Sequence, residues 1–282
     1  MSPEIIFISV LLGLAFVVGE AQPIINVLDH GAVGDGKRDD TQGFLKAWDA
    51  ACLDSRSPTL VIPPGKTFLL SQISFEGPCN SSIHVQVGGN IVAPNKLWTS
   101  ELVNWISFRN VNNLTIDGSG QIDGQGSIWW DCKNKRTFGI SGCNNSRING
   151  LKFINSPGKH LAIHKCSWVH IKGLNIAAPA DSPNTDGMYI QNSEHVEVSD
   201  TIIGTGDDCI AIGTGSSDVN MTGITCGPGH GISETVACSG IVLESIGIAL
   251  DPAAKGDRPT SYCLNAQGSK VGEVTPDVSC LE

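Results

Sequence analysis

The sequence predicts an all-β protein built as a β-solenoid, most simply a single-stranded parallel β-helix. From about residue 83 onward, short β-branched segments alternate with Gly, Asn, Ser and Asp, and no long helical period appears. Four segments at similar intervals can be laid over one another. They are SRINGLKF (146–153), VHIKGLNI (169–176), VEVSDTII (196–203) and VNMTGITC (219–226). A repeat of short strands and tight turns at this length is typical of solenoids.

Two kinds of position recur in all four segments. The apolar ones are Ile148, Ile171, Val198 and Met221. The turn-forming ones, which follow shortly after, are Gly150, Gly173, Asp200 and Gly223. Coils of this kind stack as parallel strands roughly 4.8 Å apart, so we expect each set to form a row across the coils. A β-sandwich is the alternative, but one recurring internal motif fits it less well.

The N-terminal residues predict a secretory signal peptide. Residues 5–18 form an apolar run that is short for a membrane span and suits a signal-peptide core. Small residues at 19 and 21 place cleavage after Ala21, so residues 1–21 would be removed and 22–282 would form one domain. The alternative is a buried N-terminal strand or an anchor.

A short helix is expected before the repeats begin. Residues 24–40 predict a short strand and a Gly/Asp loop, and Asp40 or Thr41 is expected to cap the helix. Its apolar positions, Phe44, Leu45, Trp48 and Cys52, follow helical spacing. The pair Asp39 and Asp40 is a rival site for chemistry, although the capping role is the better interpretation. Residues 58–70 then predict two strands around a Pro-Pro-Gly turn.

Composition excludes some classes of function. The formal net charge is −10, and would be −8 after loss of Glu4 and Glu20 with the signal peptide, so no basic nucleic-acid footprint exists. The ten cysteines contain no CxxC pair, which disfavours zinc. An even cysteine count and four N-x-Ser/Thr sequons, at Asn80, Asn113, Asn144 and Asn220, favour a secreted, disulfide-bonded glycoprotein.

The candidate catalytic residues are Asp186, Asp207, Asp208 and His230. The intervals from Asp186 to Asp207 and from Asp207 to His230 are nearly equal, and each is close to one repeat. Because each interval is about one coil, the four side chains should meet on one face of the solenoid. Adjacent carboxylates raise the pKa of one of them, so that one carboxyl can donate a proton while another activates water. The competing interpretation is structural, since turn Asp residues often cap backbone groups or bind calcium.

Several motifs resemble the polygalacturonases, the pectin-degrading glycoside hydrolases of family 28. They are NTD (184–186), GDDC (206–209) and CGPGHGIS (226–233), with DHGAVGDGKRDDT near the start, IDGQGSIWW (122–130) and NSP (155–157). The resemblance implies a right-handed parallel β-helix that hydrolyses α-1,4-galacturonan with inversion of the anomeric configuration.

The resemblance also assigns roles to individual residues. Asp207 would be the general acid, and Asp186 and Asp208 would activate the attacking water. His230 would tune or position the acid, and Asn184 would contact the sugar. Inversion calls for carboxyl groups about 6.5–9.5 Å apart, to leave room for water. Disulfides Cys209–Cys226 and Cys263–Cys280 are implied in the same way. No cofactor or metal is expected.

The chain departs from the family after Ser233. The family continues into further coils, one of which carries an Arg-x-Lys motif that binds the substrate carboxylate. No Arg-x-Lys follows His230 here, where the basic residues are Lys255, Arg258 and Lys270. We expect internal coils to be missing near 233/234, on the order of 100 residues at ~25 per coil. Leu243 follows Met221 by about one repeat, so the next coil should still stack in register.

The sequence therefore supports two functions of different class. The first is a secreted, cell-wall enzyme that hydrolyses pectin by acid/base inversion. The second is a catalytically impaired scaffold or wall-binding protein that lacks the substrate-binding Arg-x-Lys motif. The loss of this motif predicts weak or no hydrolysis. In both, the expected partner is pectin or polygalacturonate, with no nucleic acid, no membrane after signal cleavage, and a monomeric state.

Several other residues are given structural rather than catalytic interpretations. Trp129 and Trp130 could stack on sugars, but packing is the favoured interpretation. The histidines His160, His164 and His170 are expected in ordinary surface or turn roles. Cys143 and Cys166 would lie in adjacent coils, either as a disulfide or as buried small residues.

Overall fold

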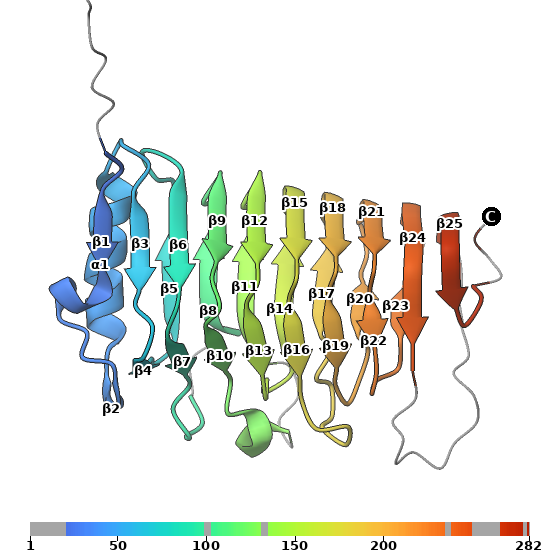
Figure 1. Cartoon of the computed structure of the whole chain (residues 1–282), viewed down its shortest axis with the longest axis horizontal. Helices are drawn as coiled ribbons and strands as arrows, with labels where there is room; N and C mark the ends of the chain where they lie inside the picture. The colour runs from blue at the N-terminus through green and yellow to red at the C-terminus, as the bar shows by residue number, and fades with distance from the viewer. Residues whose placement is uncertain are drawn as a thin grey trace, which may run out of the picture.

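The computed structural model describes residues 21–98, 103–130, 135–234, 238–249, 266–278 and 281. Within these ranges the strands pair in parallel and form an 18-stranded sheet and a seven-stranded sheet. Successive coils lie side by side along the long axis of the molecule (Figure 1). This arrangement is the parallel β-helix that the repeat predicts.

The 18-stranded sheet contains two stacks of strands. The first stack is β1 (Ile24–Asn26), β3 (Thr59–Ile62), β6 (Ile83–Val87), β9 (Leu114–Asp117), β12 (Ser146–Asn149), β15 (Ser167–Lys172), β18 (Glu194–Ser199), β21 (Ser217–Thr222), β24 (Cys238–Ile248) and β25 (Ala266–Thr275). The second stack is β2 (Asp35–Asp39), β4 (Thr67–Leu69), β7 (Asn90–Val92), β10 (Gln121–Asp123), β13 (Lys152–Ile154), β16 (Asn175–Ala177), β19 (Ile202–Gly204) and β22 (Thr225–Cys226).

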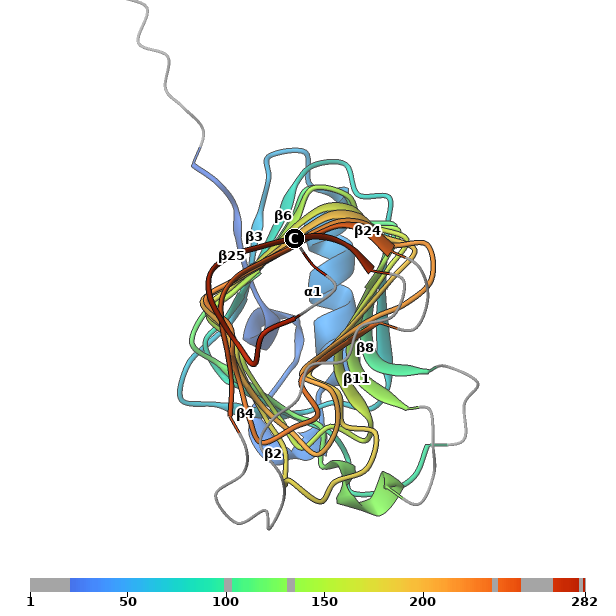
Figure 2. The same cartoon turned by 90° about the vertical axis from the view of Figure 1, so that its right-hand side faces the viewer.

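The seven-stranded sheet, called the site sheet below, adjoins the functional residues. Its strands are β5 (Ile73–Glu76), β8 (Asn104–Arg109), β11 (Arg136–Ser141), β14 (Lys159–His164), β17 (Met188–Gln191), β20 (Ile210–Ile212) and β23 (Ile232–Glu234). Seen along the coils, the sheets enclose a common interior (Figure 2). The 3-10 helices are η1 (Val27–His30) and η2 (Gly126–Trp129).

The register of the coils agrees with the alignment of the sequence segments. Ile148 pairs with Ile171, Ile171 with Val198, and Val198 with Met221. All four side chains are at most 1% exposed, so the aligned apolar positions form one row of the core. Met221 pairs in turn with Leu243, which confirms that β24 is the next coil and is in register.

The aligned turn positions share a left-handed backbone. Gly150, Gly173 and Gly223 have φ angles of 72°, 65° and 66°, and Asp200 has 51°. Glycine adopts this conformation without steric cost, and Asp tolerates it better than most residues. The sequence repeat therefore encodes a tight turn, called the repeat turn below, between the two stacks of the larger sheet.

The predicted N-terminal helix is α1 (Thr41–Leu53), which lies at the N-terminal end of the coils (Figure 1). Phe44, Trp48 and Ala51 are buried and join the core, so the helix covers apolar side chains that the first coil would otherwise expose. The expected side-chain cap is wrong. The Asp40 carboxylate accepts hydrogen bonds from the backbone N–H groups of Val33 (2.7 Å) and Gly34 (3.0 Å) instead, and so fixes the preceding loop.

Among the described residues, the cysteines include two bonded pairs and one free pair. Cys209–Cys226 forms the disulfide that the resemblance implies. Cys52–Cys79, which the sequence did not single out, joins the end of α1 to the chain beyond β5. Cys143 and Cys166 are buried free thiols, which decides between the two alternatives left open for them. Cys263 and Cys280 lie outside the described residues, as do Lys255, Arg258 and nearly all of the expected signal sequence.

Two further expectations concern aromatic residues and membranes. Trp129 is 3% exposed and packs on Trp98 with ring centroids 4.0 Å apart, as the packing interpretation predicts. Trp130 is half-buried, and its Nε1–H donates to the Ser156 carbonyl at 3.1 Å. Within the part of the chain that the structure describes, no helix has the length and apolar character needed to cross a membrane.

Candidate active site

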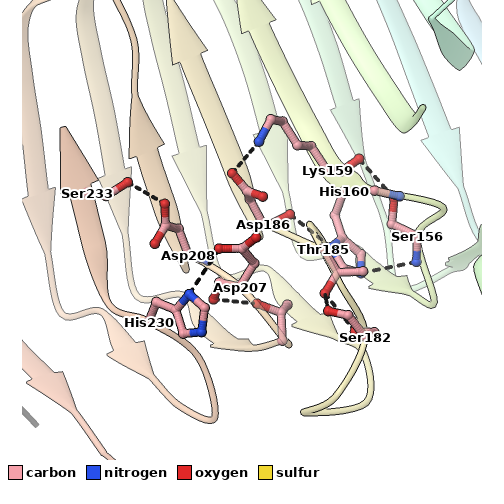
Figure 3. Close-up of polar contacts among 12 residues, drawn as sticks. Ser156, Lys159, His160, Ser182, Thr185, Asp186, Asp207, Asp208, His230 and Ser233 are labelled. Atoms are coloured by element: carbon pink, nitrogen blue, oxygen red, sulfur yellow. Dashed lines mark hydrogen bonds and ion pairs between the residues drawn. The ribbon is translucent and has the colours of Figure 1, made fainter. Parts of the chain in front are cut away.

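The candidate catalytic residues lie on three neighbouring turns that lead into the site sheet. These turns, called the site turns below, are residues 178–187 before β17, 205–209 before β20 and 227–231 before β23. Their lengths differ, unlike the repeat turns, and each is held by its neighbours. The Thr205 N–H donates to the Pro228 carbonyl (2.7 Å), and the Gly187 N–H donates to the Asp208 carbonyl (2.8 Å). The stacking therefore gathers the four candidate residues, as the spacing predicts (Figure 3).

Asp207 occupies the middle of the group. Its Oδ1 lies 3.1 Å from Nδ1 of His230, and it also accepts from the Asp208 N–H at 2.9 Å. The His230 side chain is 68% exposed and that of Asp207 is 27% exposed, so both are open to a ligand. His230 therefore contacts Asp207 directly, and its role in tuning or positioning the acid stays a prediction.

Asp208 is held from the next coil. Its carboxylate accepts a hydrogen bond from the hydroxyl of Ser233 on β23. Burial raises the pKa of Asp208. The hydrogen bond from Ser233 lowers this pKa, and the charge of Asp207 raises it further. Ser233 ends the motif that carries the resemblance, but its contact with Asp208 follows from the coil register rather than from the motif.

Asp186 is the most enclosed of the three carboxylates, with 3% of its surface exposed. It forms an ion pair with Lys159, which begins β14 one coil earlier. Burial raises the pKa of Asp186, the hydrogen bond and charge of Lys159 lower it, and the charge of Asp207 raises it again. The ion pair therefore offsets part of the cost of ionising a buried carboxyl.

His160 supports Asp186 from inside the coil. Its side chain is fully buried, so the expected surface or turn role is wrong. Nδ1 lies 3.0 Å from the Asp186 carbonyl oxygen, and Nε2 lies 3.3 Å from the Ser156 nitrogen, which fits a neutral ring protonated at Nδ1. Burial lowers the pKa of His160 to about 4. Lys159 and His160 point to opposite faces of one strand and hold the side chain and the main chain of Asp186, respectively (Figure 3).

A regularity of the sequence could have identified both residues. Lys159 and His160 precede Asp186 by nearly the same interval that separates Ile171 from Val198, which is one coil. Counting back by the number of residues in one coil from a candidate carboxylate therefore identifies the residue beside it in the preceding coil.

Other predicted site residues are less constrained. Asn184 is exposed on the first site turn and has a left-handed φ of 56°, and its contact with a sugar stays a prediction. Ligand atoms of Asp207, Asp208 and His230 lie within 4.8 Å of one another, so this trio could hold a cation. Oxygens of Asp207 and Asp208 are thus closer together than the separation of about 6.5–9.5 Å expected for an inverting pair. Exposed acidic groups often gather without a metal, and the expected metal-free reaction stays a prediction.

The arrangement can perform acid/base chemistry on a bound ester or glycosidic bond. Two carboxyls have raised pKa values, which makes them stronger bases, and a third is partly exposed and contacts a histidine. Strands and stacked turns position these groups with little freedom to move.

Comparison with known proteins identifies the family. The sequence profile of the glycosyl hydrolases of family 28 matches residues 52–239, about two thirds of the chain. The chain belongs to glycosyl hydrolase family 28. A probable polygalacturonase of Arabidopsis thaliana is 46% identical over 213 residues, which cover 74% of this chain and 47% of that protein. Polygalacturonase-2 of Solanum lycopersicum is 44% identical over 223 residues, covering 74% and 49%.

The family 28 chain spans about half the length of these curated relatives. Two solved structures share its parallel β-helix, which is right-handed. They are an endo-xylogalacturonan hydrolase of Aspergillus tubingensis (TM-score 0.67, 24% identity, covering 88% of this chain and 71% of that chain) and a polygalacturonase of Erwinia carotovora (TM-score 0.64, 20% identity, covering 89% and 77%).

Proposed function

We propose that the chain is a pectin-directed glycoside hydrolase that cleaves α-1,4-galacturonan by inverting acid/base hydrolysis. The observation that carries this proposal is the convergence of Asp186, Asp207, Asp208 and His230 from three site turns. Family membership and the polygalacturonase names of the relatives support the substrate class.

Each side chain has a role in the proposed reaction. Asp207 donates a proton to the leaving glycosidic oxygen while His230 holds it in place. Asp186 and Asp208 activate the attacking water, one of them taking its proton, and their raised pKa values favour that task. Asn184 contacts the sugar. Water then adds to the anomeric carbon from the face opposite the leaving group, so the first product has the inverted configuration.

The proposal includes secretion to the cell wall. Two disulfides favour an oxidising compartment, and the predicted signal peptide (1–21) would direct the single domain (22–282) there. Pectin or polygalacturonate would be the partner, met by a monomer.

Release of reducing ends from polygalacturonate tests the proposed function. The secreted chain should release them, and Asp207→Asn should lower the rate by about 10²–10⁴-fold because the proton donor is lost. Early products followed by NMR should show the inverted anomer. A rate that Asp207→Asn leaves unchanged would remove Asp207 from the mechanism.

A second candidate function is a pectin-binding scaffold with impaired catalysis. It is favoured by the lack of Arg-x-Lys after His230 in this sequence. In that case the folded protein binds polygalacturonate but neither it nor Asp207→Asn releases reducing ends. Circular dichroism of the same samples separates this outcome from a failure to fold.

A further inference from the structure

A groove runs over the outer face of the site sheet on the N-terminal side of Asp186. It has a volume of about 380 Å³ and crosses β8, β11, β14 and β17. Its charged or titratable lining side chains are Arg109, Arg136 and His164, and no carboxylate lines it. The groove is therefore locally basic, although the whole chain carries a net charge of −10.

Arg136 stands in register with the candidate active site. It pairs with Lys159 across β11 and β14, and Lys159 bonds to Asp186 on the next coil. Neighbouring coils are roughly 4.8 Å apart, so Arg136 lies about two coils from Asp186 along the same row. A polymer lying across the coils would meet both residues at once.

Arg136 forms no close ion pair within the described part of the chain, although the charge of Asp186 acts on it from a distance. Lys159 has Asp186 and Arg109 has Glu76 at 3.9 Å, whereas Arg136 forms no ion pair there.

Arg136 is instead held over an aromatic ring. Its guanidinium lies 5.1 Å from the ring centroid of Tyr189, over which the Lys159 ammonium also lies, at 4.9 Å. Burial lowers the pKa of Arg136, while Tyr189 and Asp186 raise it. A half-buried cation held on an aromatic ring is ready to receive a carboxylate, because little freedom is lost when it binds.

We propose that Arg136 binds the carboxylate of a uronate residue of the polymer. This residue would lie over the coils that precede Asp186 in the protein chain. The guanidinium presents a planar pair of N–H donors that matches a carboxylate, and it lies over the Tyr189 ring. This inference rests on the proposed function for the identity of the polymer. Arg136 would contact the substrate carboxylate from β11, which precedes the site turns. The Arg-x-Lys motif of the family would do so from coils that follow His230.

The test is a binding cycle with trigalacturonate and its fully methyl-esterified form as probes. Both are titrated by calorimetry into the full chain carrying Asp207→Asn, which prevents turnover, with and without Arg136→Gln. The acid form should bind at least about tenfold more weakly to the Arg136→Gln protein, while the ester should bind both proteins equally. Arg147→Gln is the matched control, because Arg147 is exposed on β12 in the other sheet, and it should leave both affinities unchanged.

Several outcomes overturn the inference. They are an unchanged affinity for the acid form, an equal loss for acid and ester, an equal loss with Arg147→Gln, and no binding of trigalacturonate to the parent chain. If Arg136→Gln does not fold, labelling of the unmutated chain with phenylglyoxal decides instead. Trigalacturonate should then protect Arg136 several-fold more than Arg147, and equal labelling overturns the inference.

The two proposals can fail separately. A chain that binds trigalacturonate through Arg136 but releases no reducing ends contradicts hydrolysis and leaves the Arg136 contact standing. A chain that hydrolyses polygalacturonate without any effect of Arg136→Gln contradicts the Arg136 contact alone.

Discussion

The repeat turns and the site turns perform different tasks in the same coils. Gly150, Gly173, Asp200 and Gly223 each bend the chain through a left-handed residue, and the bend is alike in these four coils. The site turns vary in length and carry side chains that hydrogen-bond to the neighbouring coil. Regular turns therefore keep the coils in register, and irregular turns use that register to assemble chemistry. Substitutions in both kinds of turn, and in the residues that hold the site turns, test this division from the largest expected effect to the smallest.

Gly206→Ala should disrupt the site turns. A Cβ at Gly206 would lie 2.1 Å from the Ser182 carbonyl oxygen and 2.7 Å from its nitrogen, so backbone must move. Asp207 follows directly, and a misplacement of ~1 Å can lower a rate about 100-fold. We expect a loss of at least that size in reducing-end release, together with a lower melting temperature.

Gly173→Ala is the control from a repeat turn. The nearest atom to its Cβ is 4.0 Å away, so only the left-handed φ of 65° opposes the substitution. The expected cost is about 1–2 kcal/mol of stability with unchanged kcat/KM. Equal losses of activity in the two variants would contradict the division of tasks.

Acid should destabilise the folded chain through His160. Its pKa is lowered from 6.5 to about 4 in the folded state, so the unfolded chain binds a proton first as the pH falls. This contribution to stability is present above pH 6.5 and is lost as the pH falls toward 4, and the difference in pKa corresponds to about 3 kcal/mol.

The variant His160→Asn isolates that contribution. An amide can still donate to the Asp186 carbonyl but does not titrate, so the loss between pH 6.5 and 4 should shrink in urea unfolding curves. His170→Asn, at a partly exposed position on β15, should keep the loss. If His160→Asn and the parent lose stability equally over this range, the buried neutral ring is not responsible.

Lys159→Met should move the acid limb of the pH–rate profile to higher pH. Lys159 lowers the pKa of Asp186 against the effect of burial, and Asp186 must be ionised to accept a proton. Without the ammonium, ionisation of Asp186 needs a higher pH, so the acid limb should shift to higher pH. Lys172→Met, which removes the exposed Lys172–Asp200 pair at 3.3 Å, should not move it. A shift to lower pH would contradict the proposed role of Asp186 as a base.

The sequence alone predicted the solenoid, its register and the four converging site residues. Local spacing is sufficient for these features. Each coil repeats the preceding one, so residues that are one coil length apart in the sequence lie side by side in the stack. Ile148, Ile171, Val198 and Met221 pair as aligned, and the same periodicity brings the site turns together. The disulfide Cys209–Cys226 and the roles of the acids came from the resemblance to family 28 rather than from periodicity.

Only the tertiary structure decided what surrounds the carboxylates. Lys159, His160 and Ser233 contact Asp186 and Asp208 from other coils, and burial sets the direction in which the pKa values of both carboxyls shift.

The same is true of two residues away from the carboxylates. Asp40 binds the preceding loop rather than the helix, and Arg136 lines a basic groove that no motif predicts. Spacing determines which residues become neighbours. Side-chain direction, burial and the balance of charge at a site depend on several coils together, so they appear only when the coils are stacked.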